Sequence, residues 1–268
     1  MRDSSCLNPG RAASAAVEVV NPDGAGRLVL VCEHASDAIP AALHDLGLRP
    51  GDRHSHAVWD IGARALATTL SDALDAPLVA GRVSRLVYDC NRPPEAADAI
   101  PARSEVVEVP GNRGLDADAR AARAEAVYHP FRRTLSEVLD ARPAPFALIT
   151  IHSFTPVFNG QPREVELGLL HDADPDLAQA ALHGARARQI GLDTRLNAPY
   201  DATDGVTHTL REHGVARGVP NLMIEVSNAL LRDDAGVARI GATLAPLLRD
   251  ALAACLPAAG RARTGGAQ

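Results

Sequence analysis

The chain has 268 residues and a net charge of -6, with 33 acidic side chains against 27 basic ones. It contains no lysine and no basic run, which is not typical of a nucleic-acid-binding surface, so we expect no nucleic-acid partner. No apolar stretch reaches the length of a membrane span and no apolar signal core opens the chain. We therefore expect a cytoplasmic protein with no membrane partner.

One α/β domain is expected over residues 22–257, because the length suits one large core and no long linker interrupts the pattern. Residues 1–21 and 258–268 are expected to be flexible segments. The cysteines form no CxxC pair, and Cys32 and Cys90 lie in apolar runs, which favours buried thiols.

Strands and helices alternate along the chain. Short apolar runs predict strands, and apolar residues at three- and four-residue spacing predict helices. The predicted strands are 28–32, 77–80, 86–90, 146–151, 165–170, 193–197 and 221–226. The predicted helices are 57–74, 117–139 with a kink or break at Pro130, 175–190, 206–216 and 237–256. This alternation predicts a three-layer α/β sandwich with a mixed, mostly parallel sheet.

Three apolar strands end in or contain an ionisable residue near their carboxyl ends: His34, His152 and Glu225. Open α/β sheets place their ligands at the carboxyl ends of their strands, and the strand ends of one sheet lie side by side. A histidine at such a place is more often structural than a ligand, but three ionisable residues indicate a shared site. Two histidines with one carboxylate and an open position are the usual composition of a hydrolytic zinc site.

The third ligand is best supplied by Asp60, near the start of the predicted helix 57–74. Asp60 could equally complement the helix dipole. Asp37 competes as a ligand because of its spacing from His34, although it could cap a helix instead. His56 is a further alternative, either as a ligand or as a neighbour of one.

Glu225 is the predicted general base, which would take a proton from water and deliver it to a leaving amine. The alternative is a buried glutamate paired with Arg85 or Arg217, since a fully buried unpaired glutamate is rare. Either interpretation implies a partner or a metal beside Glu225.

The segment 85–92 contains candidate contacts for a substrate carboxylate, namely Arg85, Asn91 and Arg92. For Asp89 we favour a pairing with one of these arginines and nothing more. The loop and helix over 197–213 form a predicted lid, in which His208 is the candidate substrate contact.

Five motifs in order, CEHAS…IP, HxxWDIGA, SRLVYDCNRP, TIHSFTP and HGVARGVPNLMIEVSN, resemble those of the N-formylglutamate amidohydrolase family over nearly the whole chain. The resemblance implies a phosphorylase/hydrolase-like fold related to zinc carboxypeptidases and zinc-dependent cell-wall amidases. It implies hydrolysis of a small N-acyl amino acid to a carboxylate and the free amino acid. It also implies that His34, Asp60 and His152 hold Zn2+ or another divalent metal.

The chain departs from the family pattern at Ser227 and Ala229, where members often have Arg and Asp. The acyl group and the amino acid of the substrate therefore stay open, as does the oligomeric state. Two alternatives remain: a zinc peptidase or cell-wall-type amidase with the same site, and a non-catalytic small-molecule-binding protein on the same fold.

Overall fold

The apolar runs of the sequence form a seven-stranded sheet in the computed structural model, which describes residues 16–256. In sheet order the strands are β1 (Val17–Val20), β3 (Leu78–Gly81), β2 (Leu28–Cys32), β6 (Ala147–Phe154), β11 (Asn221–Ser227), β9 (Leu167–Leu170) and β10 (Thr194–Leu196). β1 is antiparallel to β3 and β9 is antiparallel to β11, whereas the other neighbours are parallel. The predicted mixed, mostly parallel sheet is confirmed.

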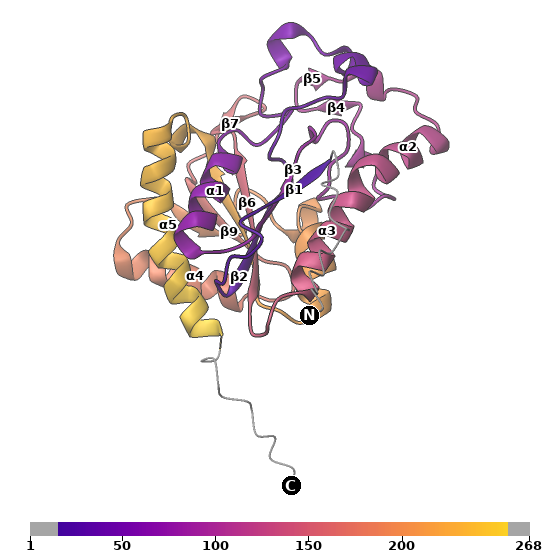
Figure 1. Cartoon of the computed structure of the whole chain (residues 1–268). Coiled ribbons are helices and arrows are strands. Elements are labelled where there is room, and N and C mark those ends of the chain that lie inside the picture. Colours follow the sequence, from indigo (N-terminus) through magenta and orange to yellow (C-terminus); the bar gives the residue numbers. More distant parts are fainter. Residues whose placement is uncertain (1–15, 257–268) are drawn as a thin grey trace, which may run out of the picture.

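Helices cover both faces of this sheet (Figure 1). One face carries α1 (Ala63–Leu74), α4 (Asp176–Arg188) and α5 (Asp234–Cys255), and the other carries α3 (His129–Asp140). Helix α2 (Ala117–Arg123) precedes α3 and has no buried residue. The side chains of β2 alternate between the two cores, as expected for a strand buried on both sides: Leu28 and Leu30 join one apolar cluster, Val29 and Val31 the other. The predicted three-layer sandwich is confirmed.

The prediction of a flexible segment over residues 1–21 is wrong for its last part. Residues 17–20 form β1, whose backbone pairs with β3 at the edge of the sheet. A four-residue strand is too short to give a clear periodic pattern, and its pairing partner lies about sixty residues away in the chain. Residues 1–15 and 257–268 lie outside the described residues, and so does the predicted tail 258–268.

The apolar run 86–90 is not a strand, contrary to the prediction, but a turn followed by irregular chain. Its side chains Leu86, Val87 and Tyr88 are buried in one apolar cluster. Its carbonyl groups are satisfied by side chains instead of a ladder: Asn112 Nδ2 donates to Leu86 O at 2.7 Å, and Arg123 Nη1 donates to Val87 O at 3.3 Å. Burial without sheet pairing therefore accounts for the apolar composition.

Helix α1 begins at Ala63, six residues later than the prediction of 57–74. Gly62 precedes it with a φ of +82°, and a Cβ there would lie 2.5 Å from Leu231 Cβ. Asp60 therefore lies in the turn before the helix, where its backbone N–H donates to His34 O at 3.0 Å. This turn connects the chain that leaves β2 with the chain that enters α1.

The predicted helix 117–139 is one helical run from α2 to α3, with a π-helical turn at Ala124–Tyr128 just before Pro130. Pro130 lies at the start of α3 and has no N–H to donate to the preceding turn. The wider π-helical turn accommodates the proline without ending the helical run. Among the described residues, no helix combines the length and the hydropathy that crossing a bilayer requires.

Two small hairpins complete the structure. They are β4 (Arg103–Ser104) with β5 (Val107–Glu108), and β7 (Val157–Phe158) with β8 (Gln161–Pro162). Figure 1 shows β4, β5 and β7 at the top of the view, beyond the same end of the sheet. Residues of both hairpins line the cavity described below.

Candidate active site

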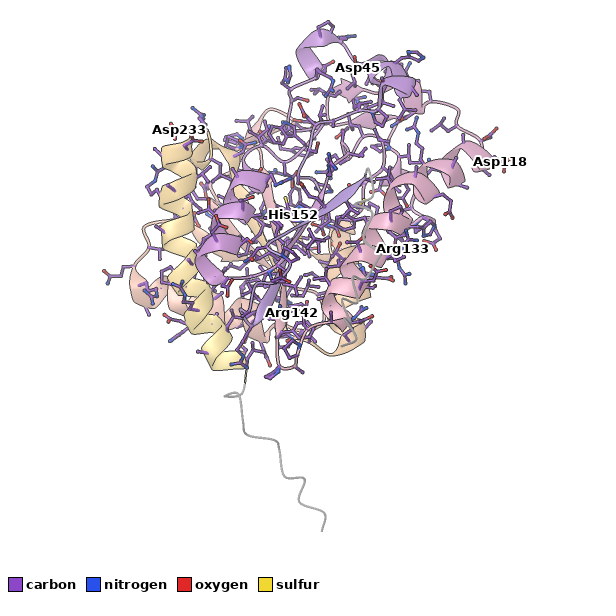
Figure 2. All side chains as sticks on the ribbon, in the orientation of Figure 1. Asp45, Asp118, Arg133, Arg142, His152 and Asp233 are labelled. Carbon is purple, nitrogen blue, oxygen red and sulfur yellow. The ribbon has the colours of Figure 1, made fainter. Side chains whose placement is uncertain are left out.

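The strand order brings the three ionisable residues of the sequence pattern together. His34 follows β2, His152 lies in β6, and Glu225 lies in β11 directly opposite His152 in the parallel register. The two imidazole rings are 4.9 Å apart between centroids, and all three residues are buried. Figure 2 labels His152 near the centre of the view, and its side chain is buried. The site is thus formed where β2, β6 and β11 are neighbours.

Asp60 joins the two histidines. Its Oδ2 lies 3.2 Å from His34 Nδ1 and 2.8 Å from His152 Nδ1, so both rings turn the same nitrogen toward one carboxylate oxygen. His34, Asp60 and His152 offer ligand atoms that all lie within 4.8 Å of one another. The structure therefore brings together the three residues that were predicted as metal ligands.

The two alternative ligands lie elsewhere. Asp37 is partly exposed and lies 4.0 Å from Arg53 Nη1 and 3.8 Å from His54 Nδ1. His56 lines the same cavity as the cluster, but its Nε2 lies 2.7 Å from Glu105 Oε2. Neither residue belongs to the His–Asp–His cluster of the described chain.

The second nitrogen of each histidine also faces a buried carboxylate. His34 Nε2 lies 2.7 Å from Asp89 Oδ1, and His152 Nε2 lies 3.1 Å from Glu33 Oε2. The sequence predicted that Asp89 pairs with an arginine and does nothing more. This prediction is incomplete, because Asp89 also contacts His34. Glu33 was not singled out at all, although its place beside His34 at the end of a buried strand was a usable signal.

Arg85 completes this network by donating to Asp60 Oδ1 at 3.1 Å and to Asp89 Oδ2 at 2.9 Å. Burial opposes the ionisation of Asp60, but His34, His152 and Arg85 outweigh it and hold the pKa of Asp60 well below its usual value. The same balance of burial against His34 and Arg85 lowers the pKa of Asp89.

The charges of the network fit a divalent cation. Three buried carboxylates, Glu33, Asp60 and Asp89, face the two imidazoles, and the partly exposed guanidinium of Arg85 pairs with two of them. These carboxylates raise the pKa of both imidazoles against the effect of burial. A bound cation would take the place of the imidazole protons among these carboxylates. Two inward-facing Nδ1 atoms with one carboxylate oxygen are also a donor set that suits zinc.

Glu225 has no arginine partner among residues 16–256. Arg217 pairs with Asp140 instead, and Arg85 donates to the two aspartates described above. Within the described chain Glu225 Oε2 is buried without a hydrogen-bond partner. Burial raises the pKa of Glu225 to about 7, which suits a group that accepts and returns a proton near neutral pH.

A cavity of about 200 Å3 opens onto the cluster and includes Arg85, Asn91 and Arg92 in its lining. Asn91 Nδ2 donates to Val206 O, and Asn91 Oδ1 accepts from Thr209 N–H. Arg92 donates to Asp98 and to the backbone carbonyl of Gly205, which precedes Val206 in the loop that Asn91 contacts. All three candidate substrate contacts line the cavity, but each already forms a hydrogen bond within the protein. Their contact with a substrate carboxylate stays a prediction.

His208 does not line this cavity. Its Nε2 forms a hydrogen bond of 2.8 Å with Tyr128 Oη, and its ring packs against the Tyr128 ring. Its predicted contact with a substrate stays a prediction.

The fold and the site together define the class: an α/β enzyme of the hydrolytic type with a candidate metal centre at the carboxyl ends of its strands. The model of the family described as N-formylglutamate amidohydrolase matches residues 26–232, more than half of the chain. The chain therefore belongs to the N-formylglutamate amidohydrolase family, and it is an amidohydrolase.

Two solved structures resemble the chain over most of its length. A gene product from Agrobacterium tumefaciens is 47% identical, with 89% of this chain and 95% of that chain covered and a TM-score of 0.87. The N-formylglutamate amidohydrolase from Ralstonia eutropha shares the fold at 19% identity, covering 88% and 97%, with a TM-score of 0.67. No curated protein matches the chain. The predicted family and the prediction of an enzyme, as opposed to a non-catalytic binding protein, are confirmed.

Proposed function

We propose that this amidohydrolase cleaves the amide bond of an N-formyl amino acid, or of another small N-acyl amino acid, with one divalent cation held by His34, Asp60 and His152. Zinc is the proposed cation because two imidazoles and a carboxylate are a common ligand set of hydrolytic zinc sites. The observation that carries the proposal is the convergence of both Nδ1 atoms on one oxygen of Asp60, with the unpartnered Glu225 on the neighbouring strand.

When bound, such a cation supplies Lewis acidity, which polarises an amide carbonyl and eases the ionisation of water. Glu225 takes the proton of the attacking water as the new C–O bond forms at the acyl carbon. It then donates this proton to the amide nitrogen as the C–N bond breaks. The products are a carboxylate, formate for a formyl amide, and the free amino acid.

The network around the cluster supports this role by fixing the reacting groups. Arg85 holds one oxygen of Asp60 and one of Asp89, so neither carboxylate can rotate freely. Asn91 and Arg92 shape the cavity wall through their bonds to the loop 204–209. A cavity of about 200 Å3 suits a small substrate better than a peptide or a glycan strand, which favours the N-acyl amino acid over the peptidase or cell-wall amidase alternative.

The test is a screen of N-formyl and N-acetyl amino acids with the zinc-loaded protein, followed by the Glu225→Gln variant on the best substrate. We expect kcat to fall by about 100-fold to 10,000-fold in the variant, because the amide cannot accept the proton. Metal content is measured in both proteins as the control. Near-normal turnover by a variant with a full complement of metal would remove Glu225 from the mechanism, and no turnover of any N-acyl amino acid by the unmodified protein would reject the function.

A further inference from the structure

His56 lines the cavity from the segment between β2 and α1. Its Nε2 is buried and lies 2.7 Å from Glu105 Oε2, whereas its side chain as a whole is 30% exposed. The exposed part of the ring therefore lies away from Glu105. The other ring nitrogen, Nδ1, is accessible and forms no hydrogen bond with any of residues 16–256.

Glu105 lies in the two-residue turn between β4 and β5, with a φ of +51°. Glycine is the usual residue where such a turn needs a positive φ, and a glutamate there is strained. The side chain of Glu105 is only 9% exposed, and its two oxygens serve two other segments. Oε2 faces His56, and Oε1 accepts from the backbone N–H of Asn159 at 2.8 Å, in the turn between β7 and β8. Glu105 therefore fixes the His56 ring against both hairpins.

This contact determines which nitrogen of His56 carries hydrogen. An unprotonated ring nitrogen and a carboxylate oxygen would repel each other at 2.7 Å, so Nε2 carries a hydrogen that faces Glu105. In a neutral imidazole the other nitrogen then keeps a free lone pair. Nδ1 of neutral His56 is thus a hydrogen-bond acceptor on the cavity wall.

The other imidazole, amide and carboxylate acceptors of the wall already have partners or roles. Asn91 Oδ1 accepts from a backbone N–H, and both oxygens of Asp60 face side chains of the buried network. The remaining histidines of the lining belong to the cluster, and Glu225 is the proposed acceptor of the water proton. His56 Nδ1 is left for a donor of the substrate.

An N-acyl amino acid brings one such donor, the N–H of its amide. This N–H loses its water on entering the cavity, which costs free energy unless the protein supplies an acceptor. An amide whose nitrogen carries an alkyl group has no hydrogen to donate, so it gains nothing from the acceptor.

We propose that His56 Nδ1 accepts the amide N–H of the substrate, with Glu105 as the positioning residue, and so selects amides that carry an N–H over N-alkylated ones. This inference rests on the proposed function, which supplies the amide. The contact places the scissile nitrogen toward the segment before α1, in the cavity that Glu225 also lines.

The test compares N-formylglutamate with its N-methyl derivative in the zinc-loaded unmodified protein and in the His56→Phe variant. If the screen selects another N-acyl amino acid, that compound and its N-methyl derivative are used. We expect kcat/KM for the N–H compound to fall about 10-fold to 100-fold in the variant, and that for the N-methyl compound to stay within about threefold. The inhibition constant replaces kcat/KM for a compound that is not turned over.

Three further variants separate this contact from a structural effect. His56→Asn offers an amide oxygen near the place of Nδ1 and should recover part of the preference for the N–H compound. Glu105→Gln should lower the preference less than His56→Phe does, because an amide orients the ring less strongly. His54→Phe is the matched control and should leave both substrates unaffected, since His54 is 83% exposed and does not line the cavity.

Zinc content is measured in every variant and should equal that of the unmodified protein. A preference for the N–H compound as large in His56→Phe as in the unmodified protein would overturn the proposal. So would an equal loss for both compounds, or a loss of zinc from His56→Phe.

A failure of the proposed function is recognised separately, because the unmodified protein would then hydrolyse no N-acyl amino acid. In that event calorimetric titration with N-formylglutamate and its N-methyl derivative tests the contact. Binding of the N–H compound at least about tenfold tighter than that of the N-methyl compound, with the difference lost in His56→Phe, retains it. Equal affinities in the unmodified protein, a difference that persists in the variant, or no binding of either compound reject it.

Discussion

Each histidine of the cluster contacts two carboxylates, one through each ring nitrogen. His34 lies between Asp60 and Asp89, and His152 lies between Asp60 and Glu33. A carboxylate on the outer nitrogen of a metal-binding histidine fixes the orientation and the tautomer of the ring. The grouping of His34 and His152 with Asp60 was predictable, because these residues follow or interrupt recognisable apolar patterns. The contacts with Glu33 and Asp89 were not, because the direction of a side chain beside a strand end depends on the folded backbone.

The outer carboxylates give a direct prediction. Glu33→Gln and Asp89→Asn should each weaken zinc binding by about 10-fold to 100-fold, because an amide orients the imidazole less strongly than a carboxylate does. Competition with a chelating indicator measures the Kd. Glu105→Gln is the matched control, since Glu105 lines the cavity and contacts His56 but not the cluster. Zinc affinity as high in the two variants as in this control would contradict the role assigned to the outer carboxylates.

Glu225 also makes stability depend on pH. Burial raises its pKa from 4.5 to about 7, so between these pH values the folded chain keeps a proton that the unfolded chain has lost. The free energy of unfolding of the metal-free protein therefore falls as the pH rises through this window, by a total on the order of 3 kcal/mol from this group. Glu225→Gln should be more stable than the unmodified protein at pH 8 and similar to it near pH 4.5.

Denaturant unfolding of both metal-free proteins at the two pH values measures this difference. The comparison is between proteins at each pH, so that the titration of groups distant from Glu225 cancels. A variant that is less stable than the unmodified protein at pH 8 would show that ionised Glu225 has a favourable partner in the folded chain.

At the scale of the elements, the position of Asp60 depends on the turn that precedes α1. The sequence pattern placed Asp60 inside a helix over 57–74, because its apolar spacing continues upstream of Ala63. In the structure the helix begins only after Gly62, whose positive φ turns the chain so that Asp60 faces the cluster. Apolar periodicity shows which residues are buried, but it does not reveal a single left-handed residue.

Gly62→Ala should therefore disturb both stability and the site. The added Cβ would lie 2.5 Å from Leu231 Cβ and 2.9 Å from Leu231 O, in addition to the strain of the positive φ. We expect a loss of more than about 1 kcal/mol in the free energy of unfolding and weaker zinc binding. Gly191→Ala is the control, because its φ is +74° but no atom lies within 4 Å of the added Cβ. It should show the backbone strain alone and normal zinc binding.

At the scale of the whole molecule, the layers follow from the sequence but the arrangement of the strands does not. The alternation of apolar runs and amphipathic segments predicted the sandwich and its mixed sheet. The order β1-β3-β2-β6-β11-β9-β10 depends on pairings between distant segments. Strand β1 was missed for this reason, and so was the hairpin that brings Phe158 to the cavity. The cluster residues and Glu225 were predictable because they interrupt or follow apolar patterns. The residues of the cavity wall were harder to predict, because most of them lie in irregular chain.

The central claim is that β2, β6 and the turn before α1 supply one shared site for a divalent cation. Anomalous diffraction at the zinc absorption edge, from crystals of the zinc-loaded protein, tests it most directly. The account predicts one strong peak about 2.0–2.2 Å from His34 Nδ1, His152 Nδ1 and an oxygen of Asp60. A peak that contacts neither histidine, or well-ordered crystals in zinc with no peak in the cluster, would contradict it.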